Sequence, residues 1–176
     1  AVAWKDWTQI VLVDTQPGTG NNRCPDDRRP AAVLDHHPGR VRQRRPLFRD
    51  VRPGIGATST IVSEYLEAEG VDVDEKTATA LVYAIETETY RPGEVMSDED
   101  VHQYLRLFRR ADHARLSRIR NATLPREYFG VFLRALRDSF IYGDVIFSQL
   151  DEVGQPDIVA EIADFLVRFD RVQWAF

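Results

Sequence analysis

Two short apolar runs near the start of the chain, each ending in an acidic residue, restrict its fold more than any other feature. Residues 9–14 form the first run, and residues 31–34 form the second, which leads into Asp35, His36 and His37. Short runs that are apolar throughout and rich in β-branched residues are typical of parallel strands buried on both faces. We therefore predict an α/β fold with a parallel β-sheet flanked by helices.

Four later segments have the patterning and the boundary residues of helices. Small hydroxyl residues at 58–60 lead into the apolar repeat of residues 61–68, which predicts a helix capped by a hydroxyl and closed by Gly70. The other predicted helices are 75–86 with Asp74 as its cap, 101–110 with Ser97 and Asp100 as a capping box, and one that begins near Pro125. This order of elements fits the predicted α/β fold.

The last part of the chain changes character and predicts a second domain. Residues 145–148 have the pattern of a strand, residues 157–168 that of an amphipathic helix, and residues 171–176 that of another strand. A single β-α-β piece leaves sheet edges and an apolar face uncovered. We expect one domain over residues 1–140 and the start of a second α/β domain over residues 141–176. Because Ala1 stands where an initiator methionine is usual, we also expect the chain to be a fragment.

Composition excludes several other classes of protein. With 43% hydrophobic and 29% charged residues, the chain is neither disordered nor a coiled coil. No apolar run approaches the length of a transmembrane helix, so we expect no membrane span. The single cysteine, Cys24, excludes an internal disulfide framework and a multi-cysteine zinc site. The net charge of −5 argues against a basic groove for long nucleic acids.

The acidic residues at the ends of the two predicted strands indicate a ligand site. Asp14 ends the first strand, and Asp35 ends the second with two histidines attached. Ligands of open α/β sheets bind in the crevice beyond the carboxyl ends of the strands. Aspartate and histidine together suit Mn²⁺, Fe²⁺ or Zn²⁺ better than Ca²⁺. The alternative is a turn beside Pro38 in which Asp35 bonds only to the backbone.

These segments resemble the DHH superfamily of phosphoesterases, which includes RecJ-like nucleases and the small nano-RNase/pAp-phosphatase enzymes. The resemblance rests on residues 11–15 (VLVDT), 32–38 (AVLDHHP), 56–60 (GATST) and 80–89 (ALVYAIETET), which follow the order of the family's motifs. The family's first metal-binding motif and its later glycine-rich motif are absent from the chain. The resemblance implies that residues 141–176 begin a substrate-binding domain of the DHHA1-like type.

The resemblance also assigns a role to each residue of the motifs. It implies that Asp14 bridges two divalent metals, usually Mn²⁺ with Mg²⁺ as the alternative, and that His36 is a ligand of one of them. His37 would contact the scissile phosphate, and Asp35 would orient the histidines. Glu88 occupies the position of another metal-binding residue, where the family usually has aspartate.

Two groups of residues are candidates for substrate binding. Six arginines crowd residues 40–52, and Arg40 lies nearest to the histidines, so they could guide an anionic substrate. A solvated loop is the alternative. Thr58 and Ser59 could offer hydroxyl and backbone N–H groups to a phosphate, although capping of the helix explains them as well.

The resemblance implies a hydrolase that cleaves phosphodiester or phosphomonoester bonds of short oligonucleotides or nucleotides with a water activated by two metals. It further implies a cytoplasmic enzyme, without a membrane partner, that forms homodimers. One alternative is the same chemistry on polyphosphate, pyrophosphate or a cyclic dinucleotide. The other is a catalytically degenerate domain that binds nucleotides or partners, which Glu88 and the missing first motif favour.

Overall fold

The computed structural model describes residues 6–20, 22, 24–25, 27–39, 45–90, 95–150 and 153–176. The chain divides into two compact units, Ala1–Ile119 and Arg120–Phe176. The sequence prediction put the domain boundary between residues 140 and 141, later than the division between the units. The difference arises because helix α5 (Arg126–Arg137) contributes Ala135 to the core of the second unit, where it packs with Ile146 and Ile158.

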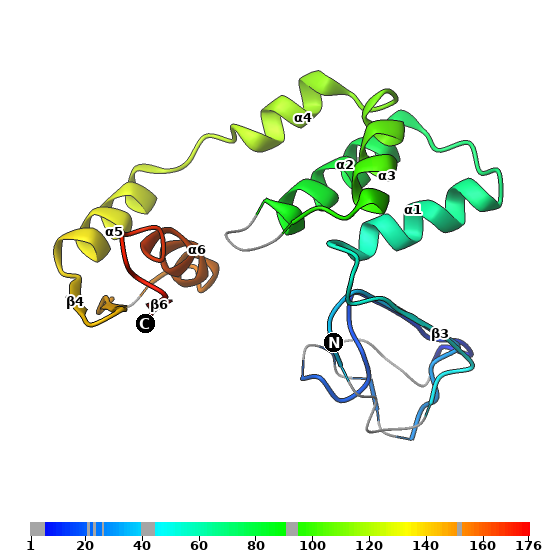
Figure 1. Cartoon of the computed structure of the whole chain (residues 1–176), viewed down its shortest axis with the longest axis horizontal. Coiled ribbons are helices and arrows are strands. Elements are labelled where there is room, and N and C mark those ends of the chain that lie inside the picture. The colour runs from blue at the N-terminus through cyan, green and yellow to red at the C-terminus, as the bar shows by residue number, and fades with distance from the viewer. Residues whose placement is uncertain are drawn as a thin grey trace. The chain divides into compact units, whose positions relative to one another are not determined.

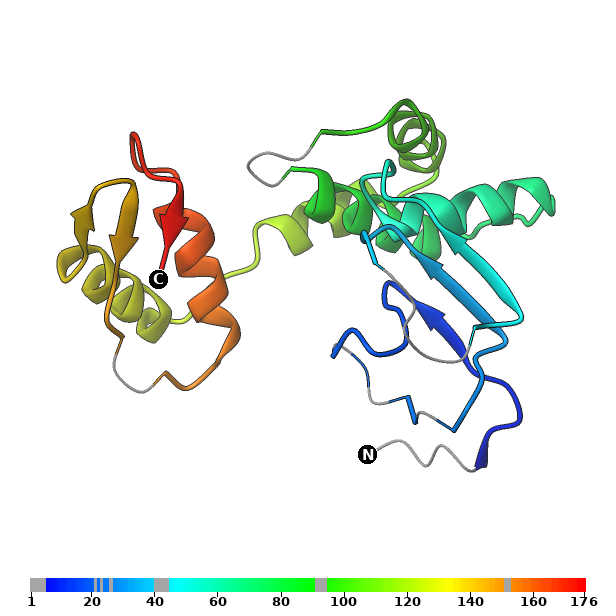
Figure 2. The same cartoon turned by 60° about the horizontal axis from the view of Figure 1, so that its bottom comes forward.

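The first unit contains a parallel sheet of three strands, as Figure 2 shows. The strands are β1 (Val11–Val13), β2 (Ala32–Asp35) and β3 (Phe48–Val51), in the order β1-β2-β3. Leu12 lies opposite Val33 in the register of β1 with β2. Together with the helices of this unit, the sheet confirms the predicted α/β class. Because the strands are parallel, Asp14 and Asp35 reach the same edge of the sheet.

One face of β1 is exposed, so the prediction of a strand buried on both faces is wrong there. Leu12 is buried, but Val11 and Val13 keep 55% and 49% of their surface exposed. Successive side chains of a strand point to opposite faces. The inner face carries Leu12 and packs with Ile10 and Val33, whereas the described residues leave the outer face largely uncovered.

Four helices complete the first unit: α1 (Thr58–Ala68), α2 (Glu75–Thr89), α3 (Asp98–Phe108) and α4 (His113–Arg120). Figure 1 shows α1, α2 and α3 grouped beside the sheet. Their apolar faces share one core, whose buried members include Ala57, Val82, Ile85 and Leu107. The side chain of Asp74 caps α2, and the capping box of Ser97 and Asp100 opens α3, so both predicted caps are confirmed, although α3 begins at Asp98 and not at residue 101.

The predicted hydroxyl cap of α1 is wrong, although the helix itself forms. Ala57 occupies the N-cap position, and no side chain caps the helix. The Thr58 hydroxyl instead donates a hydrogen bond of 2.7 Å to Oδ1 of Asp14, on the neighbouring strand end. The start of α1 is therefore tied to the edge of the sheet that carries the acidic residues.

A buried carboxylate also holds the start of α1. Asp100 is fully buried and accepts hydrogen bonds from the Gly56 backbone N–H at 2.8 Å and from the Thr60 hydroxyl. Its Oδ2 atom accepts further hydrogen bonds from the backbone N–H and the hydroxyl of Ser97. The first residue of α3's capping box and the segment before α1 therefore share one acceptor.

Gly56→Ala is expected to lower the free energy of unfolding of the first unit by about 1–3 kcal/mol, because overpacking forces side chains or backbone to shift. A Cβ at this position would lie 2.6 Å from Cγ2 of Thr89 and 2.8 Å from Oδ2 of Asp100. Gly54→Ala is the matched control, since nothing lies within 4 Å of its Cβ. Chemical denaturation of both variants measures the difference, and equal stabilities would contradict the packing argument.

The second unit packs two helices on a small sheet. Helices α5 and α6 (Asp157–Leu166) accompany the strands β4 (Phe140–Tyr142), β5 (Val145–Phe147) and β6 (Trp174–Ala175). β4 is antiparallel to β5, and β6 is parallel to it. The predicted strand-helix-strand order is confirmed. β4 was not predicted; Gly143, with a φ of 63°, forms its turn into β5.

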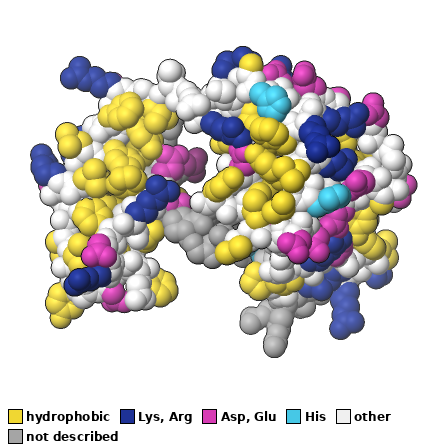
Figure 3. Space-filling model, turned by 45° about the horizontal axis from the view of Figure 1, so that its top comes forward, with side chains coloured by type: hydrophobic (Ala, Val, Ile, Leu, Met, Phe, Trp, Pro, Cys, Tyr) yellow, Lys and Arg dark blue, Asp and Glu magenta, His cyan; other side chains and the backbone are white. Residues whose placement is uncertain are grey.

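The second unit exposes many hydrophobic side chains, and Figure 3 shows them gathered on the visible face of the unit at left. The rings of Phe140, Phe147 and Phe176 stack across the sheet with centroid distances of 5.2 and 5.9 Å. Phe140 and Phe176 remain 62% and 71% exposed. None of the helices in the described part of the chain combines the length and the apolar character needed to span a bilayer.

Candidate metal centre

Asp14 stands at the carboxyl end of β1 in an unusual backbone conformation. Its backbone N–H still continues the sheet by donating to the carbonyl of Leu34 at 2.9 Å. Its φ of 60° lies in the left-handed region, which aspartate tolerates better than most residues other than glycine. Such a conformation persists where the surroundings fix it, and the hydrogen bond from Thr58 is one such contact.

His36 presents an unpaired nitrogen to Asp14. Nδ1 of His36 lies 3.3 Å from the carbonyl oxygen of Ile55, which can only accept a hydrogen bond. When the ring is neutral, its proton therefore belongs on Nδ1 and Nε2 keeps its lone pair. Nε2 is buried without a hydrogen-bond partner and lies 3.6 Å from Oδ1 of Asp14. A lone pair facing a carboxylate oxygen is unfavourable by itself, but a cation between them would satisfy both.

His37 is held by Asp35. Nδ1 of His37 lies 2.8 Å from Oδ1 of Asp35, and the His37 backbone N–H donates to the same oxygen at 3.3 Å. The hydrogen bond to Asp35 raises the pKa of His37 above its usual value, with burial opposing it. Burial raises the pKa of Asp35, but hydrogen bonds from His37 and Gln16 outweigh burial, so this pKa lies below its usual value. The pair thus favours a charged carboxylate beside a protonated imidazole.

Asp14, His36 and His37 together form a cluster in which Asp14 and His36 can hold a divalent cation, with the His37 imidazole beside them. One ligand atom from each residue lies within 4.8 Å of the other two. The imidazole and carboxylate donors suit a transition metal such as Mn²⁺, and the Ile55 carbonyl that fixes the His36 ring is a typical outer partner of a histidine ligand. The buried, unpaired Nε2 of His36 is the feature that a cation would satisfy. Because the Asp14 side chain is 52% exposed, the cluster is accessible from solvent.

A cleft of about 310 Å³ begins at Asp14 and extends between β1, α1 and α2. Glu88 from α2 lines this cleft, together with Thr58 and Ser59 from the start of α1. The structure thus brings Glu88 to the cleft but not into the cluster of Asp14, His36 and His37. The hydroxyl oxygen of Ser59 is buried there without a hydrogen-bond partner.

The arginines after the histidines have different surroundings. Arg40, Arg42 and Arg44 lie outside the described residues. Arg52 forms ion pairs with Asp50 and Glu64. Arg52 is therefore engaged within the fold, whereas Arg49 is an exposed residue of β3.

Sequence reasoning missed two groups that shape the site, the Gln16 side chain and the Ile55 carbonyl. Gln16 is buried and donates from Nε2 to Oδ2 of Asp35 at 2.7 Å. A polar residue two positions after the strand-end Asp14 was the available signal for Gln16. The Ile55 carbonyl had no signal, because every residue carries one.

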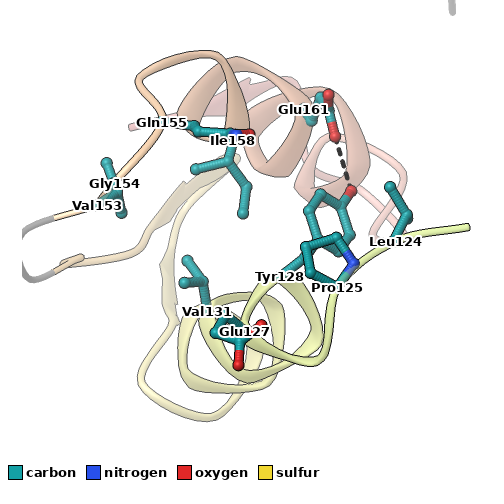
Figure 4. A pocket seen from close by; sticks show the side chains of 10 residues that line it. All are labelled: Leu124, Pro125, Glu127, Tyr128, Val131, Val153, Gly154, Gln155, Ile158 and Glu161. Carbon is teal, nitrogen blue, oxygen red and sulfur yellow. Dashed lines mark hydrogen bonds between the residues drawn. The ribbon is translucent and has the colours of Figure 1, made fainter.

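A pocket of about 290 Å³ in the second unit has a different character (Figure 4). Apolar side chains that include Val131, Val153 and Ile158 line it, and the Tyr128 hydroxyl donates to Glu161 at its rim. Its ten lining residues contain no histidine or cysteine. Among the described residues, the cluster at Asp14 is the group of three histidine and acidic side chains whose ligand atoms lie within 4.8 Å of one another.

Comparisons with known proteins give relatives of two kinds. No family model matches the chain. The chain is 26% identical over 147 residues to an uncharacterised protein of Methanocaldococcus jannaschii, which covers 82% of the chain and 30% of that protein. It is 33% identical over 92 residues to an A-adding tRNA nucleotidyltransferase of Geobacter sulfurreducens. This match covers 50% of the chain and 10% of that enzyme. The chain thus spans under a third of the length of these relatives.

Among solved structures, the chain resembles an exopolyphosphatase-related protein from Bacteroides fragilis. The TM-score is 0.65 at 16% sequence identity, over 80% of this chain and 44% of that one. At this level of sequence identity, the similarity shows a shared fold alone. The exopolyphosphatase-related protein therefore shares the α/β architecture of this chain.

Proposed function

We propose that the protein is a metal-dependent phosphoesterase of the DHH type that hydrolyses phosphate esters of short oligonucleotides or nucleotides. The observation that carries the proposal is the buried, unpaired Nε2 of His36, 3.6 Å from Oδ1 of Asp14 and beside His37. The motif resemblance and the fold shared with an exopolyphosphatase-related protein support the same class of reaction.

Asp14 and His36 would hold the cation, with Mn²⁺ as the first candidate and Mg²⁺ as the second. When bound, a divalent cation supplies a Lewis acid that activates water for attack on phosphorus and offsets charge on the phosphate. Glu88, which lines the same cleft, is the residue that we propose as a ligand of a second cation. Its carboxylate would have to approach the cluster, because it is not among the three close ligands.

The chain's own groups bind and orient the phosphate. Asp35 engages Nδ1 of His37, which leaves the remaining ring nitrogen of His37 to donate a hydrogen bond to a phosphate oxygen. Thr58 fixes the Asp14 carboxylate by donating to Oδ1. Ser59 offers a buried hydroxyl without a partner at the start of α1, where backbone N–H groups favour an anion.

Two alternatives are kept because a particular observation favours each. The exopolyphosphatase-related neighbour favours the same chemistry on polyphosphate. The position of Glu88 outside the cluster of three ligands favours a domain that binds metal and nucleotide without hydrolysis. We further propose, from the resemblance alone, that the protein acts in the cytoplasm and as a homodimer.

The experiment combines metal binding with hydrolysis by the purified protein. Calorimetric titration with Mn²⁺ is expected to reveal binding, and a short oligoribonucleotide is expected to release nucleotides only when Mn²⁺ is present. Chelation of the metal should stop release, and polyphosphate under the same conditions should be a poorer substrate. Faster hydrolysis of polyphosphate would favour the first alternative, and Mn²⁺ binding without any hydrolysis the second. No binding of Mn²⁺ or Mg²⁺ would reject the proposed function.

A further inference from the structure

Gln16 lies between the ends of β1 and β2 and is 1% exposed. It belongs to the loop after β1, and this loop folds around it. Its backbone carbonyl accepts hydrogen bonds from the Thr19 hydroxyl and from Nδ2 of Asn22, both at 2.9 Å. Burial of a long polar side chain costs free energy, because the side chain loses rotamer freedom and hydration. The hydrogen bonds that Gln16 makes inside the protein offset this cost.

The side-chain amide of Gln16 makes two hydrogen bonds with the segment that carries the histidines. Nε2 donates to Oδ2 of Asp35 at 2.7 Å and to the backbone carbonyl of His37 at 3.0 Å. The other carboxylate oxygen of Asp35, Oδ1, accepts from His37. Gln16 therefore holds one carboxylate oxygen of Asp35, while the other oxygen holds the His37 ring. Gln16 also holds the main chain of His37 directly.

Gly39 leaves the room that the amide occupies. A Cβ built at residue 39 would lie 2.7 Å from Nε2 of Gln16 and 3.1 Å from its Oε1. A side chain at residue 39 would therefore displace the amide from Asp35. This close approach is a second observation, independent of the hydrogen bonds, that the amide has one fixed place.

We propose that Gln16 is a positioning residue that orients the His37 imidazole through Asp35. The inference rests on the proposed function, in which His37 contacts the substrate phosphate. Glutamine supplies a neutral donor, whereas glutamate at this position would set an acceptor 2.7 Å from the Asp35 carboxylate. Methionine has a similar length and no donor, so it isolates the hydrogen bonds from the volume.

In Gln16→Met we expect kcat to fall about 10–100-fold, the range seen when an outer partner of an active-site histidine or metal ligand is lost. The KM and the dissociation constant for Mn²⁺ should change by less than about threefold, because Asp14 and His36 do not contact the amide. In the metal-free protein, the ¹⁵N shift of Nδ1 of the His37 imidazole should change, because this nitrogen loses its fixed hydrogen bond to Asp35.

Gly39→Ala tests the same contact from the other side and is expected to cause the same loss of kcat and the same change in the His37 spectrum. Thr19→Ala is the matched control, because it removes the hydrogen bonds of the Thr19 hydroxyl to the Thr15 hydroxyl and the Gln16 carbonyl but leaves the amide in place. A folded Gln16→Met protein with wild-type kcat and an unchanged His37 spectrum would overturn the inference. Equal losses in Thr19→Ala would do so as well.

The imidazole spectrum separates this inference from the proposed function. If the wild-type protein shows no hydrolysis, the phosphoesterase proposal fails, but the His37 spectrum of the metal-free variants still reports whether Gln16 fixes the ring. If hydrolysis is present and the spectrum does not respond to Gln16→Met or Gly39→Ala, the positioning role fails alone.

Discussion

Asp100→Ala is expected to lower the free energy of unfolding of the first unit by about 3 kcal/mol or more, since each buried polar group left unpaired costs about 1–3 kcal/mol. The carboxylate is fully buried. It accepts from the backbone N–H groups of Gly56 and Ser97 and from the hydroxyls of Thr60 and Ser97. Truncation leaves these donors without their acceptor and opens a cavity between α1 and α3. Urea denaturation followed by circular dichroism measures the change.

Asp98→Ala is the matched control for this effect. Asp98 lies in the first turn of the same helix, α3, but its side chain is exposed. Exposed substitutions away from special features usually change stability by about 0.5 kcal/mol or less. If Asp98→Ala and Asp100→Ala lose similar stability, the helix start alone accounts for the effect, and the link from Asp100 to Gly56 contributes little.

The stabilisation by Asp100 should depend on pH in the acid range. Burial raises the pKa of Asp100, but hydrogen bonds from Thr60, Ser97 and Gly56 outweigh burial and hold this pKa below the ordinary value of 3.8. A carboxyl whose pKa is lowered by folding stabilises the fold fully above its unfolded pKa. The stability difference between wild type and Asp100→Ala should therefore be constant at neutral pH. The part of the difference that depends on the charged carboxylate should shrink below pH 3.8 and be lost once the pH passes the lower pKa of the folded state, whereas the part due to the cavity should remain.

The elements that the sequence predicted correctly are those whose signals are local. The strands that end at Asp14 and Asp35 are short apolar runs, and the capping box of Ser97 and Asp100 spans four residues. β3 was missed because Arg49 and Asp50 break the apolar pattern of a buried strand. β4 was missed because it is exposed and lies close to the end of α5. Local patterns cannot reveal a strand that is fixed mainly by its neighbour in the sheet.

The candidate site was predicted as residue types but not as a network of contacts. The motif spacing identified Asp14, His36 and His37, and the structure brings their ligand atoms together. The same sequence favoured Thr58 or Ser59 as a helix cap. The outcome differs because Asp100 fixes Gly56, 44 residues earlier in the chain, and Thr58 then reaches Asp14. Contacts between such distant residues leave no pattern in a short window of sequence.

His36→Ala is expected to lower the affinity for Mn²⁺ and the rate of hydrolysis by about 100-fold or more, since even the loss of an outer partner of a ligand costs about 10–100-fold. His36 supplies the buried nitrogen that faces Asp14, and nothing else in the described residues occupies that position. His102→Ala is the matched control, because His102 is an exposed histidine of α3. Calorimetry and nucleotide release measure the two effects in parallel.

Thermal unfolding distinguishes a metal ligand from a histidine that only packs. A ligand present at 100 times its dissociation constant stabilises the native state by about 2.7 kcal/mol. Mn²⁺ should therefore raise the Tm of the wild type and of His102→Ala, but not that of His36→Ala. Without metal, His36→Ala loses the hydrogen bond to the Ile55 carbonyl but also removes an unpaired nitrogen, so its stability should fall only modestly. A large loss of stability without metal, together with an unchanged shift by Mn²⁺, would mean that His36 supports the fold and that the cation binds elsewhere.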